Sequence, residues 1–466
     1  MRLPLPPPTD SAMKPAEPDP SHVSPTQDVA DLPHKRKWFG YAAVAASLAL
    51  TYTLWLAAMG AAGEWYDNPW TYPAKVGSHG TLILMCWAFL LATRLRWVER
   101  LFGGLDKVYK AHRNIGETAF FLIFLHPVFL AVAHADSVLG FFRYGWFSGD
   151  WVRNTGLIAL AVFMLLVALS LYAKIDYHRW KRSHDFFGAL LVLIVFHAVL
   201  ANGEIMRYPV LMVWHGTWVV LALAAYVYIR IFYRWFGPLH DYTVESVNEV
   251  GDAITEIMLK PKGRSLRLAP GQFIYVSFDA AAVNKEPHPF SISSSPEAPQ
   301  LRLSVKRLGD WTEEAAQIKP GKSARVWGPY GHFCNLALAQ PRMPLVMVGG
   351  GIGITPFLSL VASEAFARRG GTSTLVYALP DRASAIYLEE LRAREDALPC
   401  LSLNVHYSDE AGYMDRPYLD SIVEQPFLDC LFLICGPPPL MEAMRTLLAD
   451  AGVNARQVIV EDFEIR

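Results

Sequence analysis

Four histidines lie in two strongly apolar segments and have nearly the same spacing in both. His112 and His126 are 14 residues apart, and His184 and His197 are 13 residues apart. On an α-helix, 14 residues rise about 21 Å and complete almost four turns, so both rings lie on nearly one face. His112 and His184 can then lie at one depth in the membrane, and His126 and His197 can lie at another. Two axial imidazoles on one iron are typical of haems that transfer electrons.

The second segment needs a local distortion for this arrangement. Thirteen residues on a straight helix turn the second ring about 140° away from the first. The helix must therefore bend or carry a π-bulge between His184 and His197. A lone intramembrane histidine is often only a hydrogen-bonding residue between helices, but two matched pairs favour haem ligation. His134, His178 and His215 lack such partners, and we expect them at interfaces or in loops.

Two motifs in the middle of the chain can hold a flavin. The first consists of His288, Pro289, Phe290, Ser291, Ile292 and Ser293. A strand of this composition can lay Phe290 and the Ser291 backbone along a flavin ring. The second contains Gly309, Trp311 and Thr312. We expect a helix to start there, with Thr312 as a cap and N–H groups presented to a diphosphate.

Two further motifs are typical of nucleotide binding. The apolar run 345–348 ends in a turn that contains Gly350, Gly351, Gly353, Ile354, Thr355 and Pro356. Glycines at such a turn permit close backbone approach to a pyrophosphate at a helix N-terminus. Near the end, Cys435, Gly436 and Pro437 follow the run 431–434. Cys435 should lie at the carboxyl end of a strand, where α/β domains bind ligands.

The composition is that of a partly membranous protein. Apolar residues make up 53% of the 466 residues and charged residues 18%, against about 25% charged residues in soluble domains. The net charge of −1 and the lack of a basic stripe argue against nucleic acid as a partner. The five cysteines form no CxxC pair, so neither a zinc site nor a disulfide framework is expected.

The elements that position these motifs divide the chain into four parts. Residues 1–33 are rich in Pro, Asp and Ser, and we predict a disordered tail. Residues 34–237 hold apolar stretches near 38–59, 76–93, 112–134, 152–173, 184–201 and 210–233. Each is close to the ~20 residues that span a bilayer, which predicts an all-α bundle of six transmembrane helices. The more basic loops alternate with the more acidic ones, which predicts that both termini are cytoplasmic.

The part after the helices should contain two folded domains. Residues 238–341 hold short β-rich runs between Gly/Pro turns, which predicts an antiparallel β-barrel that binds FAD. Residues 342–466 alternate strands and helices, which predicts a parallel α/β domain that binds nucleotide. The expected fold class is therefore a multidomain membrane protein with an all-α bundle, a barrel and an α/β domain.

Together these residues resemble the NADPH oxidase and ferric reductase family, which fuses a six-helix haem domain to a ferredoxin–NADP reductase-like module. The resemblance covers residues 34–466 and is greatest for short bacterial members. It implies two b-type haems on the four histidines, FAD, and NADPH or NADH as donor, in a multi-pass protein of the bacterial inner membrane. Cys435 and Phe463 would frame the nicotinamide site, with Phe463 covering the flavin until nicotinamide displaces it.

Two departures from the family pattern bear on the acceptor and the donor. The position four residues after His126 is Leu130, where the eukaryotic oxidases carry a second histidine, and no arginine precedes Arg94 in the second stretch. Oxygen, giving superoxide, and ferric chelate both remain expected acceptors. After the run 374–379, Asp381 favours a ribose hydroxyl and Arg382 a 2′-phosphate, so NADH and NADPH both remain open.

Two other classes of protein share some of these features. A quinone- or partner-linked haem reductase would use the same histidines and reduce oxygen only slowly. A non-catalytic membrane sensor that only binds nucleotide would need neither the flavin motif nor matched histidines. Membrane lipid is a partner of the bundle in every case.

Overall fold

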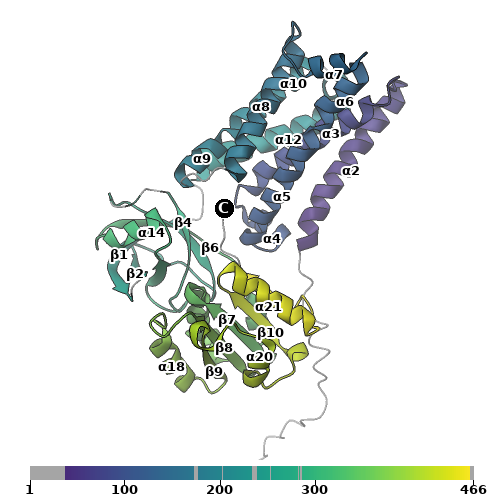
Figure 1. Cartoon of the computed structure of the whole chain (residues 1–466). Helices are drawn as coiled ribbons and strands as arrows, with labels where there is room; N and C mark the ends of the chain where they lie inside the picture. Colours follow the sequence, from purple (N-terminus) through teal and green to yellow (C-terminus); the bar gives the residue numbers. More distant parts are fainter. Residues whose placement is uncertain are drawn as a thin grey trace, which may run out of the picture.

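The fold consists of a helical bundle joined at one end to two β-containing domains (Figure 1). The structure is a computed structural model, and it describes residues 37–172, 177–201, 203–233, 239–251, 253–281, 283 and 286–461. The predicted disordered tail, residues 1–33, lies outside the described residues, as does Phe463.

The bundle contains six helical spans that are long and apolar enough to cross a membrane, as predicted. They are built from α2 (Lys37–Ala62), α3 (Thr71–Leu91), α5 (Leu105–Ile123) with α6 (Leu125–His134), α8 (Trp151–Leu171), α9 (Tyr177–Asp185) with α10 (Phe187–Ala201), and α12 (Pro209–Val227) with a π-helical turn η1 (Tyr228–Phe232). Shorter helices join them, namely α4 (Arg96–Phe102), α7 (Val138–Tyr144) and α11 (Glu204–Arg207). The chain is a multi-pass membrane protein.

Helix α3 is the central helix of the bundle. Its apolar window is 78% buried, whereas the other five spans are 17–28% buried and present apolar side chains outward. Close packing requires a small residue at Gly77, where a Cβ atom would lie 2.9 Å from the His126 backbone nitrogen. The helix thereby brings its backbone against α6.

Both histidine-bearing spans are interrupted. The third breaks at Phe124 between α5 and α6, and the fifth breaks at Phe186 between α9 and α10. The second break lies two residues after His184, between the two histidines of this span. It provides the bend that the 13-residue spacing required.

The next domain is an antiparallel sheet that curls but closes only in part. Its strands are β1 (Leu239–Val250), β2 (Ile254–Pro261), β3 (Phe273–Phe278), β4 (His288–Ser291), β5 (Leu301–Lys306) and β6 (Ser323–Tyr330). They are ordered β4-β3-β6-β1-β2-β5. The two edge strands approach each other through a bridge between Ile292 and Leu303. The domain is therefore a half-barrel rather than the closed barrel expected, and a short helix α14 (Asp310–Glu314) follows β5.

The last domain is the predicted parallel α/β domain. Its strands β7 (Leu345–Gly350), β8 (Ser373–Leu379), β9 (Leu401–Tyr407), β10 (Leu431–Cys435) and β11 (Val458–Glu461) are ordered β11-β10-β7-β8-β9. Its helices include α15 (Asn335–Ala339), α16 (Thr355–Val361), α17 (Glu364–Ala367), α18 (Leu388–Ala397), α19 (Ser408–Ala411), α20 (Arg416–Ile422) and α21 (Pro438–Asp450). The sequence analysis identified no strand at β11, and the helical stretch after the glycine-rich turn is divided into α16 and α17.

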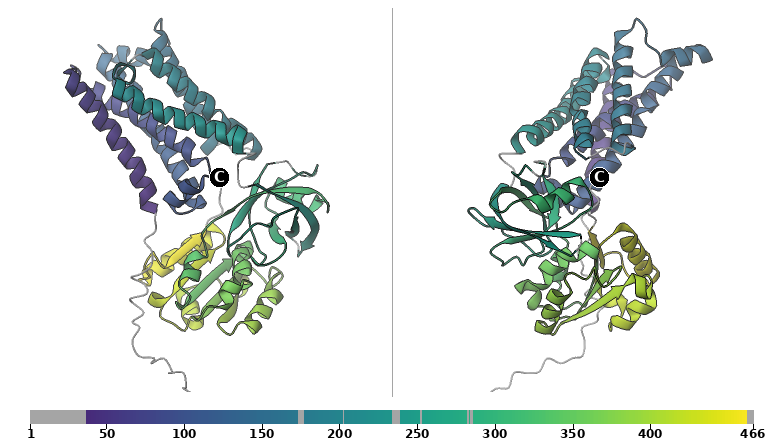
Figure 2. Two further views of the ribbon diagram at one scale, coloured as in Figure 1. Left: turned by 180° about the vertical axis from the view of Figure 1, so that it is seen from behind. Right: turned by 60° about the vertical axis from the view of Figure 1, so that its left-hand side comes forward.

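The half-barrel lies next to α9 at the end of the bundle, with the α/β domain on its far side (Figure 2). Glu286, just before β4, pairs with Lys181 of α9 at 3.8 Å. This ion pair brings the predicted flavin strand close to the helix that carries His184.

Candidate functional site

The four predicted ligands meet as two pairs. The ring centroids of His112 and His184 are 5.9 Å apart, and those of His126 and His197 are 6.4 Å apart. Two imidazole nitrogens bound on opposite sides of one metal, each at about 2.0–2.1 Å, place the ring centroids about 6 Å apart. Both pairs fit bis-imidazole ligation of an iron.

The hydrogen bonds of the four rings also fit ligation. His112 Nδ1 lies 2.9 Å from Ala88 O, and His126 Nδ1 lies 3.2 Å from Ala74 O. His184 Nδ1 lies 3.1 Å from Ser170 Oγ, and His197 Nδ1 lies 3.1 Å from Thr155 Oγ1. The first two partners belong to α3 and the other two to α8. An Nδ1 atom occupied in this way leaves Nε2 as the ligand nitrogen and sets the ring orientation. Within the described ranges, no cluster of three or more His, Cys, Asp or Glu side chains offers another metal site.

A third histidine pair, which the sequence did not reveal, lies inside the bundle. His79 Nδ1 is 3.1 Å from His215 Nε2, and both side chains are 1% exposed. The expectation for His215 was therefore wrong, because α12 turns this residue toward α3. His134 is exposed at the end of α6, as expected. The side chain of His178 lies outside the described residues.

The direction of the hydrogen bonds in this pair gives His79 a free lone pair. His215 Nδ1 lies 3.0 Å from Leu211 O, a contact that requires its proton on Nδ1. His215 Nε2 then accepts from His79 Nδ1, and His79 Nε2 has no partner among the described residues. A signal was present in the sequence, since His79 interrupts an otherwise apolar stretch.

A polar network joins the start of α3 to α11. Lys75 Nζ lies 2.7 Å from Glu204 Oε2, and the Tyr66 hydroxyl also donates to Glu204. Burial opposes ionisation of Glu204, but Lys75 outweighs it and lowers the pKa of this carboxyl. Lys75 follows Ala74, whose carbonyl binds His126. A cation therefore lies near the outer histidine pair, although the second span lacks the arginine of the eukaryotic oxidases.

The flavin motif forms an aromatic face on the half-barrel. The ring centroid of Trp311 is 4.3 Å from that of His288 and 5.4 Å from that of Phe290. Burial, with the Lys181 charge, lowers the pKa of His288 to about 4. Strand β4 pairs only with β3 along its length in the described part of the chain, so its outer edge can bind a flavin ring through the backbone of Ser291.

Not every residue of the motif takes part in this face. Pro289 pairs with Tyr275 of β3. Ile292 is 1% exposed and belongs to the core of the half-barrel. Ser293 is turned inward, where its Oγ lies 2.9 Å from Ser304 Oγ. These last two residues support the strand from within.

The loop around Gly309 is held by Thr312. Thr312 Oγ1 accepts from the backbone nitrogens of Leu308 and Gly309 at 2.8 and 3.0 Å, and its hydroxyl donates to Gly309 O at 2.8 Å. Thr312 therefore caps α14 as its third residue, in a capping box with Gly309, and the binding of a diphosphate at this loop stays a prediction. Thr312 also closes the loop and fixes Trp311 next to β4.

The two nucleotide motifs pack backbone against backbone. A Cβ atom on Gly353 would lie 2.6 Å from the Cys435 carbonyl carbon, and one on Gly436 would lie 3.1 Å from Gly350 Cα. Gly351 has a positive φ of 54°. Only glycines allow this approach. It forms one backbone surface at the carboxyl ends of β7 and β10.

The remaining motif residues support this surface. Ile354, Thr355 and Pro356 are buried at the start of α16, and Thr355 Oγ1 donates to Ile352 O at 3.0 Å. Pro437 precedes α21 and would contact a Cβ atom on Gly350. The glycines, rather than these side chains, form the approach to a ligand.

Cys435 lies at the carboxyl end of β10, as predicted. It is 0% exposed and stands in register with Gly349 on one side and Glu461 on the other. Phe463 follows Glu461 by two positions. Phe463 lies outside the described residues, so its place beside Cys435 stays a prediction.

The acidic and basic residues after β8 have partners. Asp381 Oδ1 accepts from Ser384 N and Ser384 Oγ at 2.8 and 3.0 Å, and these bonds lower the pKa of Asp381. Arg382 binds Glu410 through Nε and Nη2 at 2.7 and 2.9 Å. The charge of Arg382 is therefore compensated before any nucleotide binds.

Three family descriptions match successive parts of the chain. They are a ferric reductase-like transmembrane component at residues 78–195, an FAD-binding domain at 247–338, and an oxidoreductase NAD-binding domain at 347–446. The first includes His112, His126 and His184 and ends two residues before His197. The other two include the flavin motif and both nucleotide motifs.

Curated relatives match the part after the bundle. The ferredoxin reductase component of 3-ketosteroid-9-alpha-monooxygenase from Mycobacterium tuberculosis is 30% identical over 246 residues, which are 49% of this chain and 67% of that protein. A flavohemoprotein from Rhodopirellula baltica is 28% identical over 253 residues, which are 49% of this chain and 61% of that protein.

Among solved structures, a Neisseria gonorrhoeae ferredoxin NADP+ reductase with bound FAD and NADP matches 48% of this chain and 98% of its own, at 19% identity and a TM-score of 0.42. The three successive domains define an NAD(P)H-dependent oxidoreductase. The chain therefore fuses a ferric reductase-like transmembrane haem domain to a ferredoxin–NADP reductase-like module.

Proposed function

We propose that this protein carries electrons from cytosolic NAD(P)H across the bacterial inner membrane to an external acceptor, with both termini in the cytoplasm. The observation that supports this most strongly is that the four histidines meet as two separate pairs. Each has ring centroids about 6 Å apart, and each ring has an occupied Nδ1. His112 and His126 are 14 residues apart, about 21 Å of helix rise, and this separation supports two b-type haems in series across a bilayer.

Different parts of the chain would bind the nucleotide, the flavin and the two haems. A bound FAD would supply the conversion of a two-electron hydride donor into single electrons, and haems bound at the four histidines would supply one-electron carriers. The glycine surface at Gly350, Gly353 and Gly436 holds the nucleotide pyrophosphate. Trp311 and the edge of β4 hold the flavin. The pair His112/His184 lies nearer the reductase module, and His126/His197 lies farther away.

Oxygen, reduced to superoxide, is the acceptor we propose first. Lys75 follows Ala74, whose carbonyl orients His126; its ammonium is paired with Glu204, so an anionic product would compete with that carboxylate for it. Ferric chelate is the second acceptor, since many chelates are anions that the same lysine attracts. Reduction of a quinone or a partner protein is the remaining alternative.

The haem assignment is tested by pyridine haemochrome analysis and by NAD(P)H oxidation. The full-length protein should hold two haems per chain. His126→Leu and His197→Leu should each lose one haem and keep flavin reduction, whereas His134→Leu, at an exposed histidine, should keep both. One haem or none in the unaltered protein would refute the proposal, and so would b-type haem bands that NAD(P)H does not reduce.

The acceptor is tested by parallel assays. Superoxide dismutase-sensitive cytochrome c reduction identifies superoxide, and ferrous-chelate formation under argon identifies ferric reduction. Lys75→Gln should lower the rate with the physiological acceptor and leave haem content unchanged. A protein that reduces neither acceptor but reduces a water-soluble quinone belongs to the quinone-linked class.

A further inference from the structure

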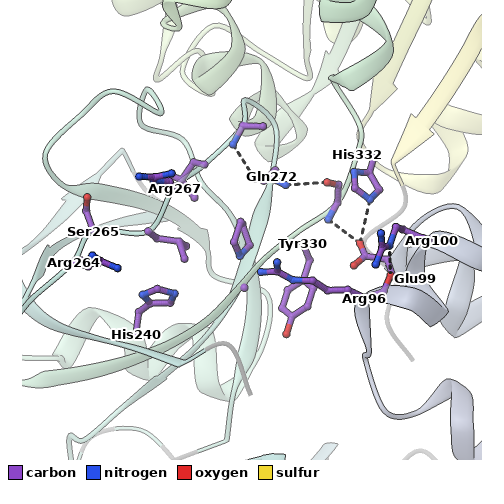
Figure 3. Close-up of a pocket in the computed structure, with 16 residues that line it drawn as sticks. Arg96, Glu99, Arg100, His240, Arg264, Ser265, Arg267, Gln272, Tyr330 and His332 are labelled. Atoms are coloured by element: carbon purple, nitrogen blue, oxygen red, sulfur yellow. Dashed lines mark hydrogen bonds and ion pairs between the residues drawn. The ribbon is translucent and has the colours of Figure 1, made fainter. Parts of the chain in front are cut away.

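A cavity of about 940 Å³ lies between the bundle and the half-barrel. On one side it is lined by Arg96 and Arg100 of α4. On the other side it is lined by Arg264 and Arg267, from the loop between β2 and β3 (Figure 3). The predicted flavin motif and both nucleotide motifs contribute nothing to its lining. The cavity is therefore separate from the sites described above.

The four arginines give the cavity an uncompensated positive charge. Arg264, Arg267 and Arg100 are exposed, and none of the four guanidinium groups pairs with a carboxylate in the described part of the chain. The acidic side chain in the lining, Glu99, is already engaged. Its Oε1 accepts from Gly331 N at 3.3 Å and lies 3.8 Å from His332 Nε2.

The cavity also lies at the level where the membrane ends. Only four residues separate the end of α3 at Leu91 from the start of α4 at Arg96. Beside Arg96, Trp97 is 49% exposed. Exposed tryptophans beside basic residues are typical of the headgroup region of a bilayer. Basic pockets on the cytoplasmic side of membrane helices bind anionic headgroups.

We propose that this cavity binds a phosphate group, supplied by the headgroup of an anionic phospholipid of the surrounding leaflet. Guanidinium groups bind phosphate through parallel hydrogen bonds. Here two line the bundle side of the cavity and two the half-barrel side, so a headgroup bound in the cavity lies between the two domains. A ligand that binds only the docked arrangement stabilises it by mass action. This site goes beyond the proposed electron-transfer function.

The test measures binding directly on the full-length protein in neutral maltoside micelles. Dioctanoyl phosphatidylglycerol is titrated while the thermal unfolding midpoint is followed, with dioctanoyl phosphatidylcholine as the uncharged control. Inorganic phosphate is titrated separately at constant ionic strength. The readout does not depend on turnover, so its failure is distinct from failure of the proposed function.

Two double variants remove one side of the cavity each, namely Arg96→Gln with Arg100→Gln and Arg264→Gln with Arg267→Gln. The matched control is Arg392→Gln with Arg394→Gln on α18, where both arginines are exposed and lie outside the cavity. Each cavity variant should weaken phosphatidylglycerol binding about 25-fold, which corresponds to about 1 kcal/mol per arginine. The control should change it less than twofold.

The outcomes separate the sources of the phosphate. Saturation by phosphatidylglycerol with no effect of inorganic phosphate assigns the site to lipid. Equal binding of inorganic phosphate, lost in both cavity variants, assigns it to a free phosphate. Equal weakening of binding in the control and cavity variants would indicate general surface attraction and would overturn the proposal. Absence of binding by both phosphatidylglycerol and inorganic phosphate would also overturn it.

Discussion

Arg94 lies over the ring of Tyr275, with 3.9 Å between the guanidinium carbon and the ring centroid. Among the described residues other than glycine, only Arg94 has a positive φ, at 54°. Two tyrosine pairs frame this contact across the same interface. Tyr109 and Tyr275 are 2.9 Å apart at their hydroxyls, and Tyr233 and Tyr330 are 2.7 Å apart. One member of each pair belongs to the bundle and the other to the half-barrel.

Loss of Arg94 should therefore loosen the docking of the half-barrel. A cation–π contact contributes about 0.5–2 kcal/mol, depending on its exposure. Arg94→Gln should slow haem reduction by NAD(P)H and leave flavin-dependent ferricyanide reduction unchanged. Stopped-flow spectra of haem and flavin measure both rates. Tyr275→Phe keeps the ring under Arg94, so its effect should be smaller; equal rates in Arg94→Gln and the unaltered protein would contradict this role.

Gly156 should control the position of the outer pair without being a ligand. A Cβ atom there would lie 2.8 Å from His197 Cε1. Gly156→Val should displace the ring, reduce the haem content from two to one, and stop electron transfer to the external acceptor. Gly216→Val is the control, because a Cβ atom on Gly216 meets nothing within 4 Å. Two haems in Gly156→Val, measured by pyridine haemochrome, would show that α8 yields to the larger side chain.

The choice between NADH and NADPH should depend on Glu410. Its carboxylate engages both donor edges of Arg382, so a 2′-phosphate must compete with it. Glu410→Gln should release the guanidinium and raise kcat/KM for NADPH relative to NADH by several-fold. Glu364→Gln removes a similar exposed pair with Arg368 and should leave the ratio unchanged. If the ratio of kcat/KM for NADPH to that for NADH is unchanged in Glu410→Gln, Arg382 does not bind the 2′-phosphate.

The half-barrel should lose stability in mild acid because of His288. Its pKa is lowered from 6.5 to about 4, by burial first and the Lys181 charge second. The unfolded chain then binds more protons than the folded chain between these two pH values. Stability therefore falls as the pH falls from about 6.5 to about 4. Melting midpoints of the flavin-free protein should show this slope, and His288→Gln should reduce it; parallel slopes would contradict the assignment.

Much of the architecture was determined by the sequence itself. A bilayer fixes the length of an apolar helix, so hydropathy alone located all six spans. Helix geometry alone required a distortion between His184 and His197, and the helix is interrupted at Phe186. Gly-rich turns after apolar runs located both loops of the nucleotide surface, since no other residue permits such close backbone approach.

Only the tertiary structure decided which distant side chains meet. His79 and His215 are 136 positions apart and pair because of how α3 and α12 are rotated, which uniformly apolar helices do not encode. The inward turn of Ser293 depends on the curl of the half-barrel, and the loop-closing role of Thr312 depends on local hydrogen bonds. The Arg94 contact and the arginine-lined cavity exist only where two separately folded domains dock. Such contacts follow from shape and orientation, which a one-dimensional pattern of residue types does not contain.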